Sequence, residues 1–246
     1  MTLTLAMHGA SDQGRVRSQN EDHFLADADE GLIVVADGLG GRPSGEVASE
    51  IAARAAHEAL TSRSWTEGRG DAMTEAVQAA NQAVAAAAEA NEELAGMGTT
   101  LTVLAVDPET GALTIGHVGD SRAYRQRDGV LEQLTRDHTV AQELLDAGKL
   151  VNPDISDHPF RHLLNRAVGT EPDVEVEVFA DSAQPGDVYL LCSDGLIAVV
   201  DDEVISQALS TARAGTLETV ADQLISTANE GGGPDNITVG LLAVGG

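Results

Sequence analysis

Four aspartates stand where apolar runs of the sequence end or begin, which is where a strand leaves the core. Three of them close or adjoin such a run, and the fourth opens the last one. If the strands share one core, the carboxylates can converge at one rim, where they repel one another unless a cation lies among them. The pattern predicts a site for hard divalent cations and a hydrolase built on it. The four residues are Asp37, Asp120, Asp194 and Asp235.

The clearest of these runs covers residues 32–36 and passes directly into Asp37. A continuous apolar stretch rich in β-branched residues predicts a strand that is covered on both faces. Gly38, Gly40 and Gly41 follow, and glycines allow the backbone to turn sharply away from the core. One Asp-Gly pair is usually only a turn, so the prediction depends on the recurrence of the pattern along the chain.

The residue types around these aspartates narrow the chemistry. Oxygen ligands favour Mg²⁺ or Mn²⁺, and the sequence has no Cys/His cluster at zinc spacing. A dinucleotide fingerprint would need glycine in place of Pro43, and a P-loop would need Lys in place of Glu46. Ser193 lacks the flanking glycines of a nucleophile elbow. The one cysteine, Cys192, lies within an apolar run and is expected to be a buried, inert thiol.

Composition and charge exclude several classes of partner. The 246 residues include 14 Lys and Arg against 40 Asp and Glu, a formal net charge of −26. Such a surface repels nucleic acid and anionic membranes, so neither is an expected partner. No apolar run approaches the roughly 20 residues that span a bilayer, and residues 1–10 do not resemble a signal peptide. A cytoplasmic location is therefore expected.

Strands and helices in an irregular order must position the aspartates. The order lacks the βαβ alternation of a doubly wound sheet and favours antiparallel hairpins flanked by helices, an α+β fold in one domain over residues 1–246. Strands are predicted over 3–9, 23–28, 32–36, 99–106, 112–118, 123–126, 130–134, 174–179, 188–192 and 237–244. Helices are predicted over 44–60, 71–94, 139–147, 202–209 and 216–229.

One long segment shows the pattern of neither a strand nor a helix. Residues 149–165 contain Pro153, Pro159, His158 and His162 and show no regular period. Long irregular segments beside a site often govern access to it. With the short helix before it, this segment is expected to form a flap over about 139–165 that gates substrate choice.

Eight stretches of the chain, in this order, resemble the protein phosphatase 2C family of metal-dependent serine/threonine phosphatases in its compact bacterial form. They cover nearly the whole chain, and the ordered set is far more specific than any one of them. The stretches are RSQNED at 17–22, ADGLGG at 36–41, GTT at 98–100, GHVGDSR at 116–122, LTRDH at 134–138, RAVGT at 166–170, CSDGL at 192–196 and GGPDNIT at 232–238.

The resemblance implies a fold and a metal site. The implied fold is a four-layer α/β/β/α sandwich, with a central antiparallel β-sandwich flanked by helices and two metals at one end. By matching positions, Asp37 would bridge both metals, and the Gly38 carbonyl would bind the first. Asp194 and Asp235 would bind the second. A third metal, known in bacterial members, points to Asp120 together with Asp194.

The resemblance also assigns residues around the metals. Glu21 or Asp22 would touch the first metal through water, and Asn236 would hold the loop in place. Arg17 would bind the phosphate, since its planar guanidinium suits two phosphate oxygens at once. His117, inside a predicted strand, is expected to be a core or edge histidine rather than a ligand.

The implied activity is hydrolysis of phosphoserine and phosphothreonine on proteins, in which a metal-bridging hydroxide attacks phosphorus without a covalent enzyme intermediate. The implied partners are phosphoproteins, including a Ser/Thr kinase whose action the enzyme reverses, and the implied state is a monomer. Animal members carry a proposed general-acid histidine where this chain has Leu39, so the leaving-group proton is expected to come from water. His138 and the flap histidines stay open as donors.

Two other functions remain open at this point. A catalytically inactive sensor or scaffold of the same fold would not need the full set of Asp37, Asp194, Asp235 and Arg17, which argues against it. The other is a structural cation site without chemistry. Phosphate release in the presence and absence of Mn²⁺ separates these hypotheses.

The negative surface predicts a substrate preference. Bound cations reverse the potential only at the site, so a phosphopeptide with basic flanks should be turned over faster than a matched peptide with acidic flanks. The difference should shrink as salt screens the charges. Initial rates on the two peptides at low and high ionic strength measure it, and a preference for acidic flanks would contradict the prediction.

Overall fold

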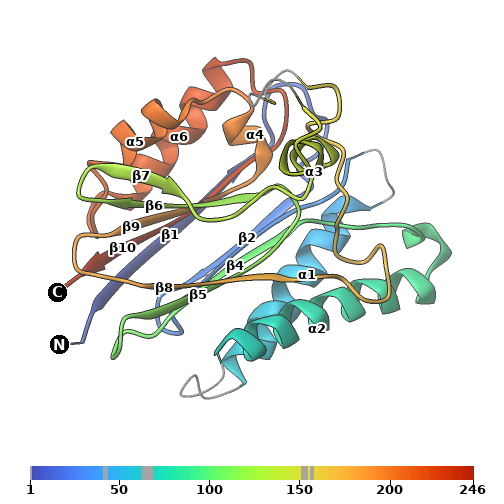
Figure 1. The fold of residues 1–246 in the computed structure, drawn as a ribbon, viewed down its shortest axis with the longest axis horizontal. Helices are drawn as coiled ribbons and strands as arrows, with labels where there is room; N and C mark the ends of the chain where they lie inside the picture. The colour runs from blue at the N-terminus through green and yellow to red at the C-terminus, as the bar shows by residue number, and fades with distance from the viewer. Residues whose placement is uncertain (1, 41–43, 63–68, 151–154, 156–157) are drawn as a thin grey trace.

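The computed structural model describes residues 2–40, 44–62, 69–150, 155 and 158–246. Two five-stranded antiparallel sheets pack face to face, and helices cover the outer face of each (Figure 1). This arrangement confirms the predicted α+β fold with four layers in the order α/β/β/α. Gly41, Pro43 and much of the segment 149–160 in the expected flap lie outside the described residues.

Each sheet combines strands from distant parts of the chain, and every pairing within it is antiparallel. The sequence favours antiparallel hairpins, and three form between consecutive strands, over residues 22–37, 101–118 and 122–133. The first sheet has the order β1 (Thr4–Asp12), β10 (Ile237–Gly245), β9 (Val188–Cys192), β6 (Arg122–Arg127) and β7 (Val130–Gln133). The second has the order β2 (Asp22–Asp27), β3 (Leu32–Asp37), β4 (Leu101–Val106), β5 (Ala112–Val118) and β8 (Glu177–Ser182).

The helices divide between the two outer faces (Figure 1). The second sheet is covered by α1 (Gly45–Thr61) and α2 (Arg69–Ala90), which the 3₁₀ turn Glu92–Leu94 follows. The first sheet is covered by α4 (Asp194–Ile197), α5 (Asp202–Leu209) and α6 (Leu217–Glu230). The remaining helix, α3 (Val140–Asp146), lies at one end of the sandwich. In the part of the chain that is described, no helix has the length and apolar character to cross a membrane.

Strand β3 shows why a continuous apolar run predicts a strand that is covered on both faces. Ile33 and Val35 pack between the two sheets with Leu191 and Leu242, whereas Val34 belongs to the cluster beneath α1 and α2. All five residues of the predicted run 32–36 are at most 1% exposed. Apolar side chains therefore cover both faces of the strand, which confirms the prediction of a doubly covered strand.

Several boundaries differ from the predictions by a few residues, two of them for a clear local or tertiary reason, and one short helix was not predicted. The second helix ends at Ala90 rather than at 94, because Asn91 is extended and its side chain accepts a hydrogen bond from the Glu93 N–H. The strand predicted at 174–179 begins only at Glu177, because the Val174 carbonyl accepts from the Gln78 side chain of α2. The short helix α4 is too brief to show a period in the sequence.

A glycine pair sets the distance between the sheets at one place. Gly9 of β1 lies opposite Gly240 of β10 in the strand register. A Cβ on Gly9 would lie 2.3 Å from the Phe24 ring, and a Cβ on Gly240 would lie 2.6 Å from Ile33 Cγ2. Both contacted residues belong to the second sheet, so the missing side chains allow the sheets to approach closely.

Replacing Gly240 with valine should therefore destabilise the protein although valine favours strands. Overpacking of this kind costs about 1–3 kcal/mol, which urea denaturation measures as a lower free energy of unfolding. Gly215→Ala is the matched control, because a Cβ there meets nothing within 4 Å, and its effect should stay within about 0.5 kcal/mol. Equal stability of the two variants would contradict the close approach of the sheets.

Candidate metal centre

Both sheets contribute to one cavity at a single end of the sandwich. Strands β3 and β9 end there, β10 begins there, and the turn from β5 to β6 crosses there from one sheet to the other. The cavity has a volume of about 340 Å³ and is also lined by Arg17, Gly38, Leu39 and Thr100. All four aspartates singled out by the sequence line it: Asp37, Asp120, Asp194 and Asp235.

The paired strands β2 and β3 place two carboxylates side by side. Asp22 lies opposite Asp37 in the register. The Ser193 hydroxyl donates to Asp22 Oδ2 at 2.8 Å, but the buried Asp22 Oδ1 has no hydrogen-bond partner among the described residues. Thr100 fixes the Asp37 backbone, since its hydroxyl accepts the Asp37 N–H at 3.0 Å and its N–H donates to the Asp37 carbonyl at 2.8 Å.

The proximity of the carboxyls has a large electrostatic effect. Removal from water, and then the charges of Asp22, Asp194 and Asp120, raise the pKa of Asp37 well above its usual range. Burial raises the pKa of Asp22 to about 6, despite hydrogen bonds that act in the opposite direction. The same causes, burial and then the neighbouring Asp194, raise the pKa of Asp120. The folded chain thus gathers carboxylates that are costly to ionise together.

Divalent cations fit this donor set. The ligands are hard oxygens, and the buried Asp22 Oδ1 still lacks a partner. Glu21 lies beside the site, where burial raises the pKa of its carboxyl. A cation among the carboxylates would stabilise their ionised forms and reverse the pKa shifts described above.

Close backbone packing explains the glycine that follows Asp37. A Cβ on Gly38 would lie 2.4 Å from the Gly45 backbone and 2.6 Å from the Glu21 carbonyl oxygen. The Gly38 N–H donates to that same carbonyl at 3.1 Å. Any other residue at this position would push the turn away from Glu21 and α1.

The Asn236 side chain joins the start of β10 to the loop before β2. Its Nδ2 donates to the carbonyls of Gln13 at 2.8 Å and Gln19 at 2.9 Å, and its Oδ1 accepts the Glu21 N–H at 2.9 Å. Three backbone groups of one loop are therefore tied to the residue next to Asp235.

The Arg17 side chain reaches the cavity from that loop. Its Nη2 lies 2.6 Å from Asp235 Oδ2, and the side chain is 39% exposed. The hydrogen bond to Asp235 raises the pKa of Arg17. A guanidinium at the open side of a carboxylate cluster is placed to meet an anionic ligand.

His162 also lines the cavity, and the sequence did not single it out as a ligand. Its Nδ1 lies 3.4 Å from Asp194 Oδ2. Ligand atoms of Asp120, His162 and Asp194 all lie within 4.8 Å of one another. His162 belongs to the irregular segment, where no period or motif indicates where a side chain points, so its approach to Asp194 could be seen only in the fold.

Two residues lie outside the cavity lining, as the sequence predicted. His117 is fully buried in β5, with Nδ1 2.9 Å from the Thr102 hydroxyl and Nε2 3.1 Å from the Arg136 carbonyl. Cys192 is fully buried in β9, and burial raises the pKa of its thiol to about 12. A thiol with so high a pKa is a poor nucleophile.

Comparison with known proteins finds a family model and relatives that match this sequence over most of its length. Residues 12–230 match the family model described as protein phosphatase 2C. The chain is 42% identical over 242 residues to the serine/threonine protein phosphatase PstP of Mycobacterium tuberculosis, and the match covers 97% of this chain and 45% of that protein. It is 40% identical to the serine/threonine phosphatase stp of Listeria monocytogenes, over 94% of this chain and 93% of that protein.

Solved structures agree with these relatives. The crystal structure of M. tuberculosis PstP/Ppp has a TM-score of 0.89 at 39% identity, and the match covers 98% of this chain and 99% of that one. The PstP catalytic domain in complex with two manganese ions has a TM-score of 0.87 at 39% identity, with both chains fully covered. The chain spans less than half of the full mycobacterial protein but all of its solved catalytic domain. In sequence, in fold and in the carboxylates gathered at one end of its sandwich, this chain belongs to the protein phosphatase 2C family.

Proposed function

We propose that this domain is a Mn²⁺- or Mg²⁺-dependent protein serine/threonine phosphatase. The observation that carries the proposal is the single cavity in which four aspartates from both sheets meet Arg17. The carboxylates suit divalent cations, and the guanidinium suits the phosphate they would bind. Relatives named as serine/threonine phosphatases, and a relative's domain with two manganese ions, support the same reaction and the same metal.

In this proposal the residues divide into ligands and supporting groups. Asp37 and the Gly38 carbonyl would hold the first cation, and Asp37, Asp194 and Asp235 would hold the second. Glu21 or Asp22 would meet the first cation through water, and the unpartnered Asp22 Oδ1 favours Asp22 for this contact.

A third cation is proposed between Asp120 and Asp194. The position of His162 supports it, because its Nδ1 lies 3.4 Å from Asp194 Oδ2 and ligand atoms of Asp120, His162 and Asp194 all lie within 4.8 Å of one another. His162 would then add a nitrogen ligand from the segment expected to form the flap. Mn²⁺ accepts an imidazole more readily than Mg²⁺ does, so this site should favour Mn²⁺.

The chemistry follows from what each part can supply. Bound divalent cations supply Lewis acidity, which lowers the pKa of water and offsets charge on a phosphate. Arg17 orients the phosphate through two of its oxygens and takes up the charge that develops on them. Leu39 lines the cavity but has no proton to give, so protonation of the departing alkoxide falls to water or to His162, the flap histidine that also lines the cavity.

The wider function is proposed on the same basis. The substrates are phosphoproteins, including a serine/threonine kinase whose action the domain opposes in signalling. The domain acts in the cytoplasm as a monomer, and residues 1–246 work as one catalytic unit in which the segment 139–165 controls access. The shared cavity supports the single unit, because its lining comes from both sheets and from the segment around His162.

Removal of one ligand tests the metal mechanism. Substitutions around metal ligands typically cost 10–100-fold, so Asp194→Asn, which changes a ligand itself, should lower p-nitrophenyl phosphate hydrolysis with Mn²⁺ by more than about 100-fold. Chelation of the metal in the wild-type protein should abolish the reaction. Asp222→Asn, on an exposed face of α6, makes the same change of charge and should leave the rate unaltered.

The outcomes distinguish the phosphatase from the two functions without catalysis. Activity that survives the chelator would overturn the metal mechanism. A wild-type protein that binds Mn²⁺ but releases no phosphate from a phosphothreonine peptide would be a sensor or a structural site. Loss of activity in Asp194→Asn with an unchanged melting temperature in the absence of metal would assign the loss to the site rather than to the fold.

The proposed role of Arg17 predicts a separate effect on phosphate binding. Arg17→Lys keeps the charge but cannot engage two phosphate oxygens in one plane. A hydrogen bond to a charged group is worth about 1.5–3 kcal/mol, so kcat/KM and the affinity for inorganic phosphate as an inhibitor should each fall about 10- to 100-fold.

Arg15→Lys is the matched control, since Arg15 is exposed in the same loop and does not line the cavity. Binding of Mn²⁺, measured by titration, should be the same in both variants and in the wild-type protein. Equal phosphate inhibition of Arg17→Lys and the wild type would contradict the assigned role.

A further inference from the structure

Two buried histidines lie behind the cavity and take no part in the proposed reaction. His117 is fully buried in β5, and His138, just before α3, is 6% exposed. Their rings are 4.8 Å apart between centroids, and neither lines the cavity that holds Arg17 and the aspartates. Buried polar rings are costly to fold around unless their hydrogen bonds are made, so the contacts of His138 indicate what it does.

His138 holds the residue before Asp120 by two hydrogen bonds. The Gly119 N–H donates to His138 Nδ1 at 3.1 Å, and the His138 backbone N–H donates to the Gly119 carbonyl at 2.7 Å. An Nδ1 that accepts carries no proton, so the ring proton lies on Nε2, 3.1 Å from Glu177 Oε2. Burial, and then the charge of Arg166, lower the pKa of His138.

The turn held in this way has little freedom. Gly119 has a φ of +112°, and a Cβ there would lie 2.6 Å from the Thr100 side chain, so only glycine fits. At the other end of the turn, the Ser121 hydroxyl lies 2.8 Å from the Thr100 hydroxyl, which also accepts the Asp37 N–H. Asp120, between the two, is 6% exposed, and its position is set by the groups that hold its neighbours.

The backbone around His138 also reaches the segment that carries His162. The His138 carbonyl accepts the Asn165 N–H at 3.0 Å, and the Val140 N–H donates to the Leu163 carbonyl at 2.8 Å. His138 is therefore bonded on one side to Gly119, next to Asp120, and on the other side to Asn165, three residues after His162. Asp120 and His162 are the two residues whose ligand atoms lie near Asp194.

We propose that His138 is a positioning residue for the third cation: by holding Gly119 and pairing with Asn165, it brings Asp120 and His162 together at Asp194. The proposal rests on the proposed function, because it concerns a cation of the same centre. It differs from the role of general acid, since the His138 ring does not line the cavity and its Nε2 proton is directed to Glu177.

Two amide substitutions separate the two ring nitrogens. His138→Asn places a carbonyl oxygen near the position of Nδ1 and can still accept the Gly119 N–H, whereas His138→Gln places its amide near Nε2 and cannot. Removal of such a supporting contact costs 10–100-fold in metal affinity. The weakest of three Mn²⁺ equivalents should therefore bind at least about tenfold more weakly in His138→Gln and within about threefold of wild type in His138→Asn.

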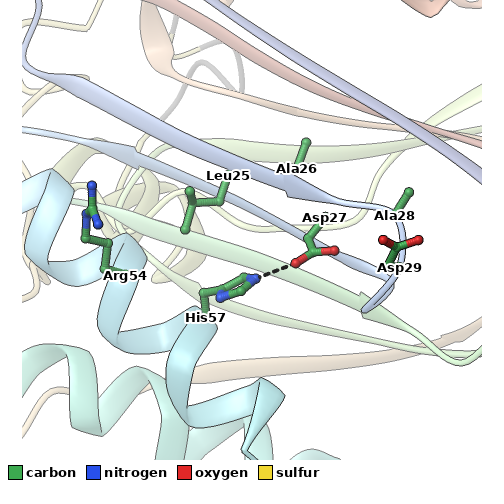
Figure 2. A pocket seen from close by; sticks show the side chains of 7 residues that line it. All are labelled: Leu25, Ala26, Asp27, Ala28, Asp29, Arg54 and His57. Atoms are coloured by element: carbon green, nitrogen blue, oxygen red, sulfur yellow. Dashed lines mark hydrogen bonds and ion pairs between the residues drawn. The ribbon is translucent and has the colours of Figure 1, made fainter.

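Electron paramagnetic resonance of free Mn²⁺ during titration counts the sites and gives their affinities without reference to turnover. Thermal melting of the metal-free variants reports any loss of fold. His57→Asn is the control: His57, on α1, pairs with Asp27 at 2.9 Å, at the end of β2 away from Asp22 (Figure 2). It should bind Mn²⁺ as the wild type does.

Each outcome decides the question. Selective weakening of one Mn²⁺ in His138→Gln, rescued in His138→Asn, supports the proposal. Equal weakening in both variants, no weakening in either, or only two Mn²⁺ on the wild-type protein would overturn it and leave the phosphatase function standing. A wild-type protein that binds no Mn²⁺ would instead overturn the proposed function.

Discussion

Repulsion among carboxylates held at one end of the sandwich is the constraint on which the rest of the structure depends. Folding brings the four lining aspartates and Asp22 to one end of the sandwich. Burial there raises the pKa of Asp22, Asp37 and Asp120. Such a cluster disfavours folding, because each carboxylate loses hydration and comes close to other negative charges. Three apolar clusters, one between the sheets and one beneath the helices on each side, provide the stability that offsets it.

The rigid surroundings of the cluster follow from the same constraint. Repelling groups stay together only if their backbones are held, and backbone hydrogen bonds hold them here. Thr100 fixes Asp37, Asn236 ties the loop of Glu21 to β10, and His138 holds Gly119. Arg17 offsets part of the charge through Asp235. The cavity is thus held in shape partly by its own lining residues Thr100 and Arg17 and partly by Asn236 and His138, which lie outside the lining.

Much of this arrangement could be predicted from the sequence, because its signals are local. The run 32–36 is apolar on both faces and ends in Asp-Gly, and the run 188–192 repeats the pattern, so both strands and their aspartates could be located from residue type alone. The order of motifs then indicated the four layers. Hairpins were predictable for the same reason, since a turn and its two strands are neighbours in the chain.

The remainder depends on contacts between distant segments, which no local pattern encodes. The approach of His162 to Asp194 requires the path of an irregular segment. The late start of β8 requires the Gln78 side chain of α2. The joining residue Asn236 was assigned from the motif, but its partners Gln13 and Gln19 could be identified only in the fold.

The contact of Asn236 with the loop before β2 also has a consequence for biosynthesis. Residues 235 and 236 leave the ribosome after nearly all of the chain described here, and β10 must then insert between β1 and β9. A nascent chain that has not yet released residues 235 and 236 therefore lacks one wall of the cavity, so the cavity is complete only after β10 has paired with both of its neighbours.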